Sequence, residues 1–266
     1  MQIKTGVLFS AVCLLFASIL PANEKIVVAA FEYPQIYQKS SNSGIALDLV
    51  REAFKAVAID VEYKFYPVAR MIASVSAGQS LCGVGGTVLF EKTEVASSVN
   101  IAAPVQYVSQ VFLYNSKKYP NGITFDSLEQ LSNYRIGVLF SSGINKLLEK
   151  SKNLKLETNP THDGTAQQLQ MGRVDLWAIV DITGLWYMKT QFPAEAKLYK
   201  YSKAFNRGDI SVVFSKKRDP DNAYCNKFLK GLAIIKKNGT YMKTMAQYYG
   251  GVNKINQEAL VDDMRK

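Results

Sequence analysis

One order of elements occurs twice along the chain, and this repetition constrains the fold more than any other feature. Apolar runs and helical spacing over residues 25–88 predict the order strand–helix–strand–helix–strand. The same order returns over residues 135–181, and in both halves the second helix ends at a glycine, Gly78 and Gly172. Two such units predict an α/β chain with two lobes, each built on a sheet rich in parallel strands.

Two further apolar strands lie outside these units, at residues 107–114 and 210–214, and neither has the composition of a linker. We therefore expect the chain to leave the first lobe, build the second and return. The two strands would then form a hinge above a cleft. The expected boundaries are 23–112 for the first part of lobe 1, 113–210 for lobe 2, 211–251 for the return to lobe 1 with its helices, and 252–266 for a C-terminal tail.

The N-terminus has the three-part pattern of a secretory signal peptide. Lys4 supplies a positive charge, residues 6–20 form an apolar run, and Pro21 and Ala22 offer a small-residue exit. The run is shorter than the roughly 18 to 20 residues of a spanning helix, which argues against the alternative of a retained anchor. We expect residues 1–22 to be cleaved and the mature protein to be periplasmic.

The basic charge of the chain is spread along its length. The formal net charge is +10, and no arginine-rich arm or nucleic-acid motif accompanies it, so we expect no nucleic-acid partner. Two interpretations of the charge remain open: a basic solvated surface, or a functional surface that steers an anionic ligand or contacts anionic lipid or peptidoglycan. We expect the protein to be a monomer.

Cleavage of residues 1–22 would leave two cysteines, Cys82 and Cys225. In an oxidising compartment such a pair, far apart in sequence, is a candidate disulfide. The bridge would tie the C-terminal helices to the first lobe. The alternative is two unrelated buried thiols.

Signals of catalysis or metal binding are scarce in the sequence. His162 is the only histidine, and it lies in the turn-like stretch 159–163, where we expect a solvated side chain. Cysteine, histidine and carboxylate residues do not cluster at metal-ligand spacing, so we expect no metal and no cofactor. Ser141 and Ser142 lack the flanking glycines of a nucleophile elbow. The sequence therefore favours a binding protein over an enzyme.

Residues suited to ligand binding follow the predicted strands. In open parallel sheets, ligands bind beyond the carboxyl ends of the strands. A helix N-terminus adds free N–H groups that favour an anion. These positions hold aromatic, cationic, hydroxyl and carboxylate side chains, which together suit a small polar or zwitterionic ligand. The candidate binding residues are Tyr33, Tyr66, Arg70, Thr87, Lys92, Ser141, Ser142, Gly143 and Asp181. Core packing, solvated charge and helix capping remain alternative roles for them.

Several short stretches of the chain are similar to a known family. They include residues 44–50, 85–92, 135–138 and 172–175 with Asp181, and 237–241 near the C-terminus. In order and spacing they resemble the extracellular solute-binding proteins of family 3, the receptors of polar amino-acid importers. The resemblance implies a two-lobed, type II periplasmic-binding-protein-like fold with a two-strand hinge. It also implies a small polar ligand and, as partners, the membrane subunits of an ABC transporter.

Two positions depart from the pattern of the amino-acid-binding members. Lys92 stands where they carry an arginine that grips the ligand carboxylate, and lysine cannot reproduce that two-pronged contact. Val68 stands where many relatives have an aromatic residue. Two alternative functions stay open beside the importer receptor. One is a dehydratase-like enzyme using Glu32, Lys92 or Asp181. The other is a periplasmic sensory or accessory module.

Overall fold

A computed structural model describes residues 24–91, 93–140 and 142–265, and within these ranges a nine-stranded sheet runs through the whole molecule. Its order is β2-β1-β3-β9-β4-β7-β5-β6, with β8 paired to β4. The strands are β1 (Glu24–Ala30), β2 (Ile59–Phe65), β3 (Cys82–Gly85), β4 (Val99–Asn115), β5 (Arg135–Leu139), β6 (Lys155–Asn159), β7 (Leu176–Val180), β8 (Tyr199–Tyr201) and β9 (Asn206–Ser215). The predicted signal peptide, residues 1–22, lies outside the described residues.

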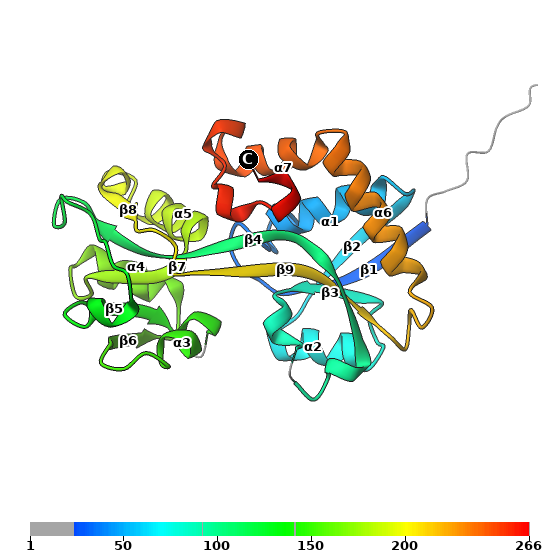
Figure 1. Cartoon of the computed structure of the whole chain (residues 1–266), viewed down its shortest axis with the longest axis horizontal. Helices are drawn as coiled ribbons and strands as arrows, with labels where there is room; N and C mark the ends of the chain where they lie inside the picture. Colours follow the sequence, from blue (N-terminus) through cyan, green and yellow to red (C-terminus); the bar gives the residue numbers. More distant parts are fainter. Residues whose placement is uncertain (1–23, 92, 141, 266) are drawn as a thin grey trace, which may run out of the picture.

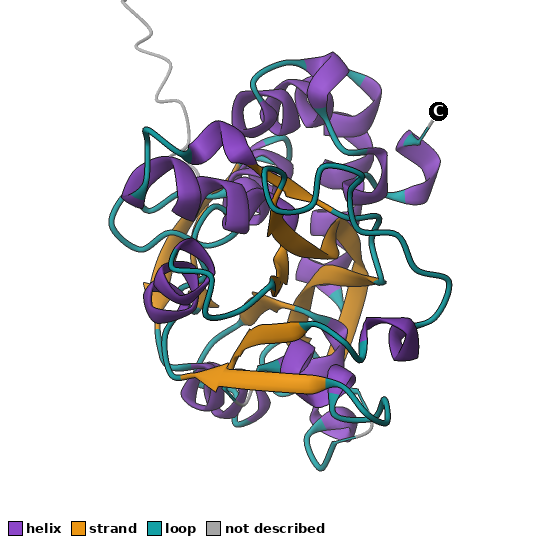
Figure 2. Ribbon diagram, turned by 90° about the vertical axis from the view of Figure 1, so that its left-hand side faces the viewer, coloured by secondary structure: helices purple, strands orange, loops and turns teal. Residues whose placement is uncertain are grey.

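The long antiparallel strands β4 and β9 connect two lobes (Figure 1). In lobe 1, β1 pairs in parallel with β2 and β3, and β3 pairs with β9. In lobe 2, β5 pairs in parallel with β6 and β7, and β7 pairs with β4. Helices surround the strands (Figure 2). The predicted fold, with a parallel-rich sheet in each lobe and a hinge of two strands, is confirmed.

Seven α-helices lie within the described residues: α1 (Ile45–Lys55), α2 (Val68–Ser76), α3 (Gly143–Leu148), α4 (His162–Gln170), α5 (Asp181–Gln191), α6 (Ala223–Lys237) and α7 (Thr240–Tyr249). None of these helices is long and apolar enough to cross a membrane.

Lobe 1 has a core on each face of its sheet. Val28, Phe54 and Phe228 belong to the larger core, which joins the sheet to α1, α6 and α7. Met71 and Val75 of α2 pack on the opposite face. The helices α1 and α6 cross so closely at Gly231 that a Cβ built there would lie 1.8 Å from the Ala53 carbonyl oxygen.

Lobe 2 also buries side chains on both faces of its strands. Phe112, Ile136 and Leu148 belong to the cluster that α3 covers. Trp177 and Met188 belong to the cluster that α4 and α5 cover. Strands that are buried on both faces have continuous apolar sequences, and residues 176–180 of β7 show this pattern.

The two cysteines do not form the predicted disulfide. Cys82 of β3 and Cys225 of α6 are both free and buried. Burial raises the pKa of each thiol above its ordinary value. The Cys225 amide donates to the Asp219 carboxylate at 2.9 Å, and the Asn100 side chain lies 3.6 Å from the Cys225 sulfur. The structure therefore has the alternative arrangement, two buried thiols.

The C-terminal segment, residues 252–265, is folded against lobe 1 and is more than a tail. It forms the short 3-10 helices Val252–Lys254, Gln257–Ala259 and Asp262–Met264. Leu260 and Val261 are buried in the larger core of lobe 1. The sequence of this segment has no periodic apolar pattern from which its structure could be predicted. Its conformation depends instead on tertiary contacts with lobe 1.

Candidate functional site

The carboxyl ends of strands from both lobes meet at the boundary between the lobes. Tyr33 follows β1 in lobe 1, and its ring makes an edge contact with His162, which follows β6 in lobe 2, with centroids 5.4 Å apart. Thr183, just after β7, donates its hydroxyl hydrogen to the Pro34 carbonyl at 2.8 Å. Burial raises the pKa of the Tyr33 phenol well above its ordinary value, and a hydrogen bond with the Val180 backbone partly opposes that rise. The predicted site residue Tyr33 therefore lies between the two lobes.

His162 is packed among aromatic rings, whereas the sequence analysis expected it to be solvated. Its ring lies 5.9 Å from Trp177 and 5.7 Å from Tyr187, measured between centroids. Both ring nitrogens are buried and have no hydrogen-bond partner among the described residues. Burial lowers the pKa of His162 to about 4, although the Asp163 carboxylate acts in the opposite direction. The expectation was wrong because the turn at 159–161 leads directly into α4, which faces Tyr33 and α5.

Arg70 and Tyr66 form a cation–π pair at the end of β2. The Arg70 guanidinium lies over the Tyr66 ring, 5.5 Å from its centroid, and Lys64 approaches the same ring at 5.6 Å. Arg70 is exposed, and Tyr66 is half-buried. The aromatic face therefore holds two positive charges near the end of a strand, where an anionic group of a ligand would be attracted.

Thr87 connects the end of β3 to the hinge strand β9. Its backbone N–H and its hydroxyl donate to the Asp209 carboxylate at 3.3 and 2.8 Å. The Ser211 hydroxyl donates to the same carboxylate at 3.1 Å. Asp209 was not among the predicted site residues, because the second hinge strand was expected to begin at residue 210. The signal that could have identified Asp209 is its carboxylate immediately before the apolar run 210–214, because β9 in fact begins at Asn206 and includes Asp209.

Ser142 caps α3. Its hydroxyl oxygen accepts from the Asn145 amide at 3.0 Å, so the capping role left open in the sequence analysis is the one that the structure has. Gly143 is exposed at the start of the helix, and Phe140 just before the cap keeps 63% of its surface exposed. Two further predicted site residues, Lys92 and Ser141, lie outside the described residues.

Asp181 opens α5, and both of its carboxylate oxygens have partners within the protein. One oxygen accepts from the Ile182 amide at 2.7 Å, and the other from the Asn256 side chain at 2.6 Å. The residue is only 2% exposed, and burial raises its pKa despite these hydrogen bonds. Asp181 thus contacts the C-terminal segment, which the sequence analysis left without structure.

The arrangement suits binding by hydrogen bonds and charge. Within the described ranges, His, Cys, Asp and Glu side chains form no group of three that could hold a metal ion. Of the acid–base candidates from the sequence, Asp181 is buried and bonded, Glu32 is exposed, and Lys92 lies outside the described residues. Of the predicted site residues, Tyr33, Tyr66, Arg70 and Thr87 lie at or near strand ends in the part of the chain that the structure describes.

Solved structures support the two-lobed fold. A histidine kinase sensor domain with similarity to periplasmic binding proteins aligns with a TM-score of 0.65 and 16% identity, covering 86% of this chain and 98% of that chain. The substrate-binding protein of an amino acid ABC transporter aligns with a TM-score of 0.61 and 18% identity, covering 85% and 99%. An ancestral amino acid-binding protein, a precursor of cyclohexadienyl dehydratase, aligns with a TM-score of 0.63 and 18% identity, covering 84% and 94%.

No curated protein matches the chain. A family model does match it, from residue 25 to residue 251. This span contains both lobes and both hinge strands, and it ends just before the C-terminal segment. The chain belongs to the bacterial extracellular solute-binding proteins, family 3.

Proposed function

We propose that the protein binds a small polar or zwitterionic, amino-acid-like solute in a cleft between its lobes and delivers it to an ABC importer. The observation that carries the proposal is the meeting of β1, β6 and β7 at the lobe boundary, through Tyr33, His162, Pro34 and Thr183. Ligands of open parallel sheets bind beyond such strand ends. Family membership supports the same role in the periplasm, with the chain acting as a binding protein and not as an enzyme.

The charges at the end of β2 favour a ligand with an anionic group. Arg70 and Lys64 lie over one aromatic ring, and both residues are exposed. Thr87 would offer its backbone N–H and hydroxyl to the ligand by exchanging the Asp209 carboxylate, which accepts from both groups in the structure, for the ligand's anionic group. The predicted residues Lys92, Ser141 and Gly143 complete the proposed site. Asp181 is left out of it because its oxygens are already bonded.

A thermal-shift screen of amino acids, amines and organic acids tests the proposal. A ligand that binds only the folded state raises the melting temperature, since it stabilises by about 2.7 kcal/mol at a hundred times its Kd. For any hit, Arg70→Ala should weaken the affinity at least about tenfold, roughly 1.4 kcal/mol. Arg173→Ala is the matched control, because Arg173 is equally exposed but precedes β7, away from the carboxyl ends of the strands. A screen without any shift would count against the proposal.

A periplasmic sensory module is the second candidate, favoured by the alignment with nearly the whole of a kinase sensor domain. Deletion of the coding sequence separates the two functions. An importer receptor is required for uptake of its ligand, whereas a sensory module leaves uptake intact and changes a signalling output.

Mass spectrometry of the bound solute after incubation would show turnover if the protein were a dehydratase-like enzyme.

A further inference from the structure

The C-terminal segment, residues 252–265, is anchored in lobe 1. Ile255, Leu260 and Val261 are at most 5% exposed and belong to the larger core of that lobe. The Val261 amide donates to the Tyr241 hydroxyl of α7 at 3.4 Å, and Lys236 of α6 pairs with Asp263 at 3.0 Å. The segment therefore moves with lobe 1, although it lies beyond the span of the family match.

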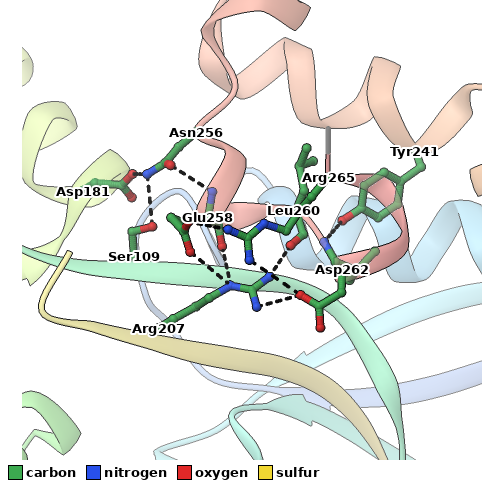
Figure 3. Close-up of polar contacts among 10 residues, drawn as sticks. Ser109, Asp181, Arg207, Tyr241, Asn256, Glu258, Leu260, Asp262 and Arg265 are labelled. Atoms are coloured by element: carbon green, nitrogen blue, oxygen red, sulfur yellow. Dashed lines mark hydrogen bonds and ion pairs between the residues drawn. The ribbon is translucent and has the colours of Figure 1, made fainter. Parts of the chain in front are cut away.

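The same segment is bonded to the hinge strand β9 through Arg207 (Figure 3). The Arg207 guanidinium donates to the Glu258 and Leu260 carbonyl oxygens at 2.8 and 2.5 Å, and to the Asp262 carboxylate at 2.8 Å. It also lies over the Tyr107 ring of β4, 3.4 Å from the ring centroid. One side chain thus joins both hinge strands to the segment.

Asn256 extends this contact to lobe 2. Its side-chain amide donates to the Ser109 hydroxyl of β4 at 3.0 Å and to the Asp181 carboxylate of α5 at 2.6 Å. Its side-chain oxygen accepts from the Glu258 amide at 3.0 Å, which fixes the orientation of the amide group. Figure 3 shows the Asn256 amide nitrogen bonded to both Ser109 and Asp181. The side chain therefore spans from a segment anchored in lobe 1, past the hinge, to the first residue of a lobe 2 helix.

We propose that residues 252–265 act as an interlobe latch, in which Asn256 holds Asp181 and so favours the lobe arrangement seen in the structure. Rotation of lobe 2 about β4 and β9 moves α5 away from the segment. That movement leaves the Asp181 carboxylate with the Ile182 amide as its remaining donor among the described residues, and removing a donor from a buried carboxylate oxygen is costly. Asn256 is thus a positioning residue of the hinge, and Asp181 serves the latch and not the ligand.

The inference rests on the proposed function only in requiring that the lobes move, so its test uses the protein without any ligand. Small-angle X-ray scattering of wild type and Asn256→Ala measures the radius of gyration. We expect a larger radius and a broader distribution of interatomic distances for Asn256→Ala. Asn253→Ala is the matched control, because Asn253 is exposed on the same segment. Asp181→Asn, which weakens the same bond from the other side, should shift the radius in the same direction.

Hydrogen exchange distinguishes an open latch from an undocked segment. In Asn256→Ala, amides at the start of α5 should exchange faster, whereas those of residues 259–261 should stay protected. Loss of protection in both regions, or a radius equal to wild type in both variants, would overturn the latch. If scattering still shows compaction with a solute found in the screen, only the latch fails. If neither variant nor solute changes the radius, the closing-lobe function fails as well.

Discussion

At the scale of single residues, the environment of His162 sets an expected dependence of stability on pH. The imidazole is enclosed by Tyr33, Trp177 and Tyr187, and its nitrogens have no partner among the described residues. A protonated ring would lose hydration without gaining a hydrogen bond there. The folded state consequently favours the neutral ring, and the pKa of His162 falls from 6.5 to about 4.

We expect the free energy of unfolding to decrease as the pH falls from 6.5 to 4. Above pH 6.5 the His162 ring is neutral in both the folded and the unfolded state, so protonation of His162 does not lower the free energy of unfolding. Below that value the unfolded chain takes up a proton that the folded chain resists, and the loss reaches about 3 kcal/mol near pH 4. Urea unfolding between pH 4 and 8 measures it. His162→Phe keeps an aromatic ring in place and should flatten this part of the profile; an unchanged profile would contradict the assignment.

The sequence could predict which side chains follow a strand, whereas their role in ligand binding stays a prediction. Tyr33, Tyr66 and Thr87 were chosen as candidates because they come within three residues of the ends of β1, β2 and β3. The environment of His162 and the partner of Asp181 could not be predicted. Each depends on a second segment, and nothing local in the sequence encodes the approach of Asn256 to Asp181 over 75 positions.

At the scale of elements, the motif at 172–175 explains how a short sequence pattern positions a strand. Arg135, the first residue of β5, donates to the Gly172 carbonyl at 2.7 Å and pairs with Asp175 at 3.1 Å. Lys118 pairs with the same carboxylate at 2.6 Å, and these charges help to hold the pKa of Asp175 well below its ordinary value against the effect of burial. The motif therefore fixes the parallel start of β5 and β7 and belongs to the scaffold of lobe 2.

One-sided periodicity marks a helix in the sequence, and α5 lacks this signal. Its apolar residues, from Ile182 to Met188, surround the helix and give no amphipathic pattern. The helix also begins at Asp181, immediately after β7, so no loop composition separates the two elements. The position and length of α5 depend on its packing against β4 and β7, and a single sequence does not show such packing.

The crossing of α1 and α6 gives an element-scale test. Gly231→Ala should destabilise the fold by roughly 3 kcal/mol or more, because the new Cβ would overlap the Ala53 carbonyl and force the helices apart. Gly143→Ala is the matched control, since a Cβ built there meets no atom within 4 Å. Thermal unfolding of both variants measures the difference. Equal melting temperatures would show that the two helices separate without cost.

At the scale of the whole molecule, lobe 1 is assembled from both ends of the chain, and lobe 2 is inserted between them. β4 and β9 carry the chain out and back, so the sheet is continuous through both lobes. The repeat in the sequence predicted this topology because each strand–helix unit encodes its own parallel sheet. It did not predict that residues beyond the family span would complete the core of lobe 1.

Removal of residues 252–266 tests whether the family span alone forms a stable molecule. Ile255, Leu260 and Val261 each contribute about 1.5 kcal/mol or more by burial, so the shortened chain should lose about 5 kcal/mol. That loss is comparable to the whole stability of many domains. Urea unfolding should therefore show a much lower midpoint, together with a smaller dependence on urea because less surface is buried. Asn256→Ala, which keeps the three apolar side chains, should retain most of the stability. A shortened chain as stable as the full one would mean that the segment is docked without supporting lobe 1. The latch would then have no firm anchor from which to hold Asp181.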